Sequence, residues 1–134
     1  MVKMNSVIHF EMPAEDKKRM SKFYNKAFGW QTQQLGPEMN EYVVVTTSET
    51  DAKGRPKKPG SINGGFYQKS ADPKYQYPSL VIGVEDISES VQKVKAAGGT
   101  ISGEIMEIPG VGQFVSFIDT EGNHLSMLQP LSDM

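Results

Sequence analysis

Residues 7–30 have the sequence VIHFEMPAEDKKRMSKFYNKAFGW, which predicts a short strand followed by an amphipathic helix. Side chains of a strand alternate between its two faces, so His9 in mid-strand should share a face with Val7 and Glu11. Gly29 favours the end of the helix at that point. The buried stripe of the helix is expected at positions three and four apart, namely Met20, Phe23, Tyr24 and Ala27.

The same pattern returns in residues 77–99, YPSLVIGVEDISESVQKVKAAGG. Asp16 and Asp86 precede the two helices and lie 70 residues apart. Gln68 and Gln129, near the ends of the two halves, lie 61 residues apart. Each half continues after its helix with three segments rich in β-branched and aromatic residues. The chain is therefore predicted to be a duplication of a βαβββ unit.

The predicted fold class is α+β: two tandem βαβββ modules that form one curved, partly closed mixed sheet with the helices outside. We expect a single domain over residues 1–134, with module one at 5–69, a linker at 70–78 and module two at 79–130. The first half is longer because of the polar segment SETDAKGRPKKPGS at 48–61, which predicts an exposed hairpin loop.

Composition excludes several classes of function. Hydrophobic residues make up 37% of the chain, charged residues 22%, and the net charge is −2, without a clustered basic stripe. Nucleic acid is therefore not an expected partner. The absence of cysteine excludes disulfides, thiolate metal sites and cysteine nucleophiles. No stretch is apolar enough to predict a membrane segment, so we expect a cytoplasmic protein.

Three motifs carry a resemblance to a known family: IHFEMPAEDKKRMSKFYNKAFGW, VIGVEDISESVQKVKAAGG and IPGVGQFVSFIDTEGNHLSMLQP. The chain resembles the vicinal oxygen chelate superfamily, which includes glyoxalase I, extradiol dioxygenases and bleomycin-resistance proteins. The third motif, a D-x-x-G-N turn followed by an alternating strand, is the most specific. The resemblance implies a cavity for a small organic ligand and a homodimer.

Metal-dependent members resemble one another at four ligand positions, two on the first strands of the two modules and two on the last. By the spacings above, this chain has His9, Gly65, Ser79 and Ser126 at those positions. A serine hydroxyl is a poor ligand for Zn²⁺, Ni²⁺, Mn²⁺ or Fe²⁺, and glycine offers only its backbone. We therefore expect a degenerate metal site and no metal or other cofactor.

His9 is the candidate catalytic residue, as an acid or base, because it alone in this quartet titrates near neutral pH. It could equally contact a ligand, or be satisfied by a neighbouring strand. Glu11 shares its face and could orient it or raise its pKa, although exposure to solvent is the default for a carboxylate near a strand end. His124 shares the face of Ser126, so His9, Glu11 and His124 could together form a rearranged metal site.

The glycine pair Gly64-Gly65 either admits a ligand close to the backbone or marks a bulge. The candidate ligand-binding residues are thus His9, Glu11, Gly65, Ser79, His124 and Ser126. The expected function is binding of a small organic molecule, as in drug-resistance proteins, or metal-free catalysis with His9. The alternative is a metal-dependent lyase, isomerase or dioxygenase with rearranged ligands. An interaction module built on the 48–61 loop is a third class.

Overall fold

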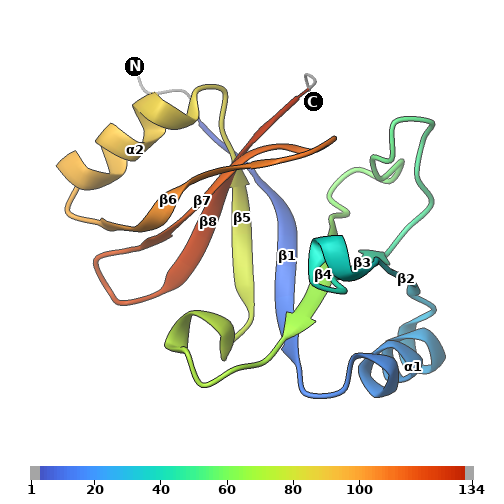
Figure 1. Ribbon diagram of the computed structural model, residues 1–134. Coiled ribbons are helices and arrows are strands. Elements are labelled where there is room, and N and C mark those ends of the chain that lie inside the picture. Colours follow the sequence, from blue (N-terminus) through green and yellow to red (C-terminus); the bar gives the residue numbers. More distant parts are fainter. Residues whose placement is uncertain (1–3, 132–134) are drawn as a thin grey trace. The chain divides into compact units, whose positions relative to one another are not determined.

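Two βαβββ repeats follow one another in the computed structural model, which describes residues 4–131 (Figure 1). The chain divides into two units. The N-terminal unit is His9–Pro78, and the C-terminal unit holds the residues up to Ile8 together with those from Ser79 onward. No helix within residues 4–131 is long and apolar enough to cross a membrane.

The N-terminal unit has a four-stranded arrangement in the order β2-β3-β4-β1. β1 and β4 pair in parallel, whereas the β2/β3 and β3/β4 pairs are antiparallel. The first two residues of β1, Val7 and Ile8, belong to the C-terminal unit. The elements are β1 (Val7–Ala14), α1 (Lys17–Phe28), β2 (Gln31–Gln34), the 3-10 turn η1 (Pro37–Met39), β3 (Val43–Thr46), β4 (Asn63–Gln68) and the 3-10 turn η2 (Pro73–Tyr75).

The C-terminal unit repeats this plan with the order β5-β8-β7-β6. Its first and last strands, β5 and β8, pair in parallel, and the other pairs are antiparallel. The α+β class and the duplicated βαβββ unit are therefore confirmed. The elements are β5 (Ser79–Gly83), α2 (Ile87–Ala96), β6 (Thr100–Ile108), β7 (Gly112–Ile118) and β8 (His124–Pro130).

The start of each helix shows the repeat in atomic detail. The Asp16 side chain caps α1 by accepting a hydrogen bond from the Arg19 amide, and Asp86 caps α2 by accepting one from the Glu89 amide, both at 3.0 Å. Aspartate is a favoured N-cap because its carboxylate pairs with amides that the helix leaves free. The two predicted helix starts, 70 residues apart, are therefore equivalent in structure as well as in sequence.

Each unit buries one face of its strands against its own helix. In the N-terminal unit the buried core is Ala14, Val43, Val45 and Phe66, with Phe10, Met12, Met20, Tyr24 and Trp30 packed around it. In the C-terminal unit the buried core is Val84, Ile87, Val91, Val115, Phe117 and Met127. Because strand side chains alternate, the opposite face of each unit is left for other residues.

The predicted stripe of α1 is only half right. Met20 and Tyr24 pack on the core, but Phe23 is 57% exposed and Ala27 is also exposed. Phe23 instead lies at the edge of the stripe and contacts the rings of Tyr24 and Phe28.

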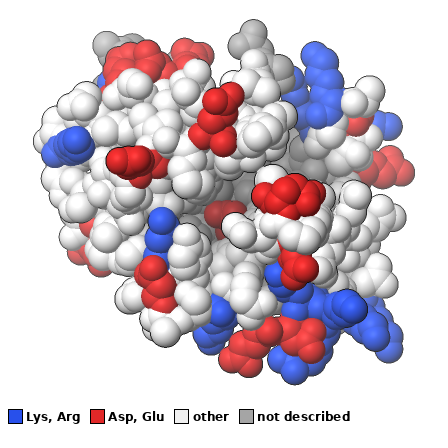
Figure 2. All heavy atoms as spheres, in the orientation of Figure 1, with Lys and Arg blue, Asp and Glu red and all other residues white. Residues whose placement is uncertain are grey.

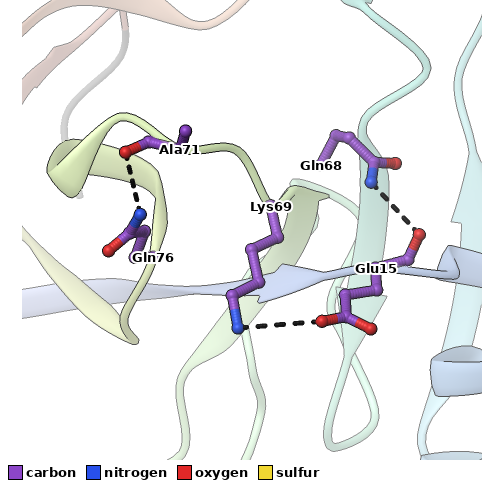
Figure 3. A network of polar contacts seen from close by, with 5 residues as sticks. All are labelled: Glu15, Gln68, Lys69, Ala71 and Gln76. Atoms are coloured by element: carbon purple, nitrogen blue, oxygen red, sulfur yellow. Dashed lines mark hydrogen bonds and ion pairs between the residues drawn. The ribbon is translucent and has the colours of Figure 1, made fainter.

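The connections of the N-terminal unit are exposed but internally bonded. Asp51 holds the tip of the 48–61 loop by accepting hydrogen bonds from the amides of Lys53 and Arg55 at 2.8 and 3.0 Å. At the end of β4, the side-chain amide of Gln68 donates to the Glu15 backbone oxygen at 3.1 Å (Figure 3). The Lys69 ammonium lies 3.9 Å from the Glu15 carboxylate. These contacts hold the end of β4 against the end of β1.

Candidate functional site

Three polar side chains of the N-terminal unit form a hydrogen-bonded chain. The hydroxyl of Tyr42 donates to Glu11 Oε2 at 3.0 Å. The hydroxyl oxygen of Tyr42 also lies 3.0 Å from His9 Nε2. Sequence separations of 31 and 33 residues show that the fold, not local sequence, brings Tyr42 to the strand. Tyr42 is thus the group that links the two candidate residues of β1.

Strand alternation places this chain on the face opposite α1. Phe10 and Met12 of β1 pack into the core beneath the helix, so His9 and Glu11 point to the other side. In the parallel β1/β4 pair, Glu11 lies beside Gly65. The prediction that His9 and Glu11 share a face is confirmed, and Glu11 is half-buried rather than exposed, because Tyr42 covers and bonds it.

The two glycines of β4 make room for aromatic rings on both faces of the strand. A β-carbon at Gly65 would overlap the phenol of Tyr42, and one at Gly64 would lie about 2.5 Å from the ring of Phe10 on the core side. The register between β4 and its neighbours runs without a shift at these residues, so the pair does not mark a bulge. The space over Gly65 is occupied by the chain's own tyrosine.

Burial decides the protonation of this cluster. Desolvation lowers the pKa of His9 from 6.5 to about 4, so the imidazole is neutral at pH 7. Glu11 therefore does not raise the pKa of His9, which was one of the options from sequence. Desolvation raises the pKa of Glu11, opposed by the hydrogen bond from Tyr42. The pKa of Tyr42 is raised well above its usual range by burial and by the Glu11 charge.

A second tyrosine lies in the electrostatic field of Glu11. Burial, the Glu11 charge and then Tyr75 raise the pKa of Tyr67 to about 12. Its hydroxyl donates to the backbone oxygen of Tyr77 at 2.7 Å, and its ring contacts Tyr75 edge-on. Tyr67 is two residues beyond Gly65 on β4, and so belongs to the same face.

The candidate residues of the C-terminal unit are bonded within that unit. Ser79 Oγ donates to the backbone oxygen of His124 at 2.7 Å. The hydroxyls of Ser126 and Ser116 are 3.1 Å apart, and both residues are buried. Within residues 4–131, His124 Nδ1 is the buried side-chain atom that lacks a hydrogen-bond partner. His124 and Ser126 face away from α2, because Leu125 between them packs on the core that includes residues of α2.

Comparison with known proteins agrees with this architecture. The Glyoxalase/Bleomycin resistance protein/Dioxygenase superfamily model matches residues 6–127. The chain belongs to this superfamily. A glyoxylase-like domain-containing protein from Didymella fabae is 29% identical over 126 residues, with 92% of each chain covered. The family indicated by the sequence motifs is therefore confirmed.

Solved structures of the superfamily share the fold at low sequence identity. A glyoxalase/bleomycin resistance protein/dioxygenase superfamily member from Vibrio splendidus aligns with a TM-score of 0.61 and 15% identity, over 94% of this chain and 99% of that one. Methylmalonyl-CoA epimerase from Mycobacterium tuberculosis aligns with a TM-score of 0.65 and 12% identity, over 98% and 94%. At these identities the likeness establishes the fold alone.

The residues at the superfamily's usual ligand positions do not fit a divalent cation. His9 Nε2 is bonded to Tyr42, the space over Gly65 is filled, and the hydroxyls of Ser79 and Ser126 are bonded to protein atoms. Residues 4–131 contain no group of three His, Asp or Glu side chains placed to hold a metal. Neutral hydroxyls already engaged in hydrogen bonds are weak ligands.

Sequence reasoning missed Tyr42, Tyr67 and Ser116. A signal for Tyr42 was present: Val44 pairs with Gly65 in the β3/β4 register, and Tyr42 stands two residues before Val44 and so shares its face. A glycine in mid-strand, with a tyrosine directly before the neighbouring strand, is consistent with a ring packed over the missing side chain.

Proposed function

We propose that this member of the superfamily binds a small organic molecule on the face of the N-terminal unit that carries His9, Glu11 and Tyr42, without a metal at the usual position. The observation that supports it most is the Tyr42 phenol, which lies over Gly65 and bonds both His9 and Glu11. A group that fills a ligand position and engages the remaining histidine favours metal-independent recognition.

The chemistry of this face suits an organic ligand. It combines a neutral imidazole, a half-buried carboxylate and two tyrosine rings, and such mixtures of apolar surface with a few fixed polar groups are typical of small-molecule sites. An enzymatic form of the proposal would use His9 as a weak base, because burial moves its pKa to about 4, away from the neutral range expected from sequence.

The test combines metal content with ligand mapping. The protein is purified without chelator, its metals are measured by elemental analysis, and methylmalonyl-CoA, bleomycin and a metabolite library are screened by thermal shift. We expect metal far below one ion per chain, and ligands whose binding shifts the NMR signals of His9 and Tyr42. Ligands that shift only distant signals would contradict the proposed site.

The competing function is a metal-dependent lyase, isomerase or dioxygenase in which His9 is one ligand. It is supported by superfamily membership alone. It predicts about one Zn, Ni, Mn or Fe per chain, lost in the His9→Ala variant. We also expect a cytoplasmic homodimer, which sedimentation equilibrium and cell fractionation would test.

A further inference from the structure

We infer that this face recognises its ligand through donors on the ligand, so that the ligand carries a protonated amine or amidine. The inference rests on the proposed site and adds the chemical class of what binds there. The ligand class depends on which polar atoms of the cluster still have a hydrogen to donate and which have a free lone pair.

The single proton of Tyr42 fixes the tautomer of His9. Because the phenol donates that proton to Glu11, its oxygen can only accept from His9. Nε2 of the neutral imidazole must therefore carry the hydrogen, and Nδ1 is left with a lone pair. The second nitrogen of His9 is thus an acceptor.

No donor of the cluster remains for an anionic ligand. The Nε2 hydrogen of His9 is spent on Tyr42, the Tyr42 hydroxyl on Glu11, and the Tyr67 hydroxyl on the backbone oxygen of Tyr77. His9 Nδ1 and Glu11 Oε1 have no protein partner in the described part of the chain, and neither is among its buried unpartnered atoms. Two acceptors are therefore open to a ligand.

The charge of Glu11 has no cationic partner among the described side chains. The pKa of Glu11 responds to burial and to the Tyr42 hydrogen bond, and not to the charge of a lysine or arginine. Three lysines of this unit have other partners: Lys17 bonds the Glu41 backbone oxygen, Lys69 pairs with Glu15, and Lys74 lies over the Tyr75 ring. Figure 2 shows blue residues gathered over α1, at the lower right of the view, with red residues among them. A half-buried carboxylate without a counter-ion favours a cationic ligand group.

The tyrosine rings strengthen this preference. The Tyr42 ring covers the strand beside Glu11, and Tyr67 lies close enough for the Glu11 charge to raise its pKa. Aromatic faces attract cations and repel anions, since the ring face is the negative end of its quadrupole. Carboxylate, imidazole lone pair and rings therefore select the same kind of group.

The test uses four aromatic probes of similar size: benzamidine and benzylamine as cations, benzamide as the neutral analogue and benzoate as the anion. Long-range ¹H–¹⁵N spectra report the tautomer of each histidine, and the chain has only two. We expect the Nε2–H form for His9, a shift of its Nδ1 signal with the cations at millimolar concentration, and no shift with benzoate.

Variants separate the charge of Glu11 from its size. Glu11→Gln should weaken benzamidine binding by about tenfold or more, since a charge-assisted hydrogen bond is lost. Glu15→Gln is the matched control, because Glu15 is exposed and, among residues 4–131, pairs with Gln68 and Lys69 at the end of β4, and it should leave binding unchanged.

Three results would overturn the inference: benzoate binding as tightly as benzamidine, no cation binding at His9, or the Nδ1–H tautomer in the free protein. These differ from failure of the proposed function. A metal-free protein that binds an anion at His9 contradicts only the ligand class, whereas stoichiometric metal lost in His9→Ala contradicts the proposed function.

Discussion

The phenol of Tyr42 occupies the space that a side chain at Gly65 would need. The hydroxyl placed there also bonds His9 and Glu11, so one residue fills the gap left by glycine and fixes the polar groups beside it. Glycine and tyrosine thus act as a pair, and neither is interpretable without the other. Through this pairing the histidine at a usual ligand position already has a protein partner for its Nε2 atom.

The Gly65–Tyr42 pair predicts strong coupling between substitutions. Gly65→Ala alone should destabilise the protein by about 1–3 kcal/mol, because the methyl group forces the ring to move. In a Tyr42→Ala background the same change should be neutral or stabilising, since alanine restricts the unfolded chain. Urea denaturation of the four members of the cycle measures the coupling, and additive effects would contradict the contact.

The hydroxyl of Tyr42 should contribute to stability through its hydrogen bonds to His9 and Glu11, in addition to the packing of its ring. Tyr42→Phe keeps the ring over Gly65 but leaves the His9 Nε2 hydrogen and the Glu11 carboxylate without their partner. We expect a loss of about 1–3 kcal/mol in the free energy of unfolding. Tyr77→Phe is the control, because Tyr77 is 69% exposed and should change stability by less than about 0.5 kcal/mol. Equal effects of the two changes would show that the chain of hydrogen bonds contributes little.

Sequence alone predicted the fold well because its signals are local. The helix starts near Asp16 and Asp86, Gly29 as the stop of α1 and the alternation of β1 each depend on a few neighbouring residues. The site was harder, because Tyr42 reaches His9 across 33 residues. Periodicity places His9 and Glu11 on one face, but it does not say which side chain of another strand covers that face or how far burial lowers the pKa of His9.

His9 should make stability depend on pH. Its folded-state pKa of about 4 lies below the ordinary 6.5, so its contribution is present above pH 6.5 and is lost as pH falls toward 4. The loss should reach up to about 3 kcal/mol, since each tenfold difference in ionisation is about 1.4 kcal/mol. Urea denaturation across this range measures it, and His9→Gln should flatten the curve.

Glu11 provides the control for that measurement because its effect has the opposite sign. Its pKa is raised, so its contribution is present below the ordinary value and is lost as pH rises through the folded-state value. Glu11→Gln should therefore steepen the fall of stability toward low pH, while His9→Gln flattens it. A His9→Gln curve that follows the unmodified protein would show that His9 is not held neutral by burial.

The buried hydroxyl pair of the C-terminal unit gives a test of what Ser126 does. Ser126 stands at one of the four positions that the family resemblance marks as metal ligands, and its hydroxyl is bonded to that of Ser116 at 3.1 Å in a buried position. Ser126→Ala should cost about 1–3 kcal/mol, because Ser116 then keeps a buried hydroxyl without a partner. Replacing both serines by alanine removes both polar groups and should cost less than the single change. Urea denaturation of the single and double variants decides the matter: a double variant that loses the sum of both single effects would mean that each serine is bonded to something other than its neighbour.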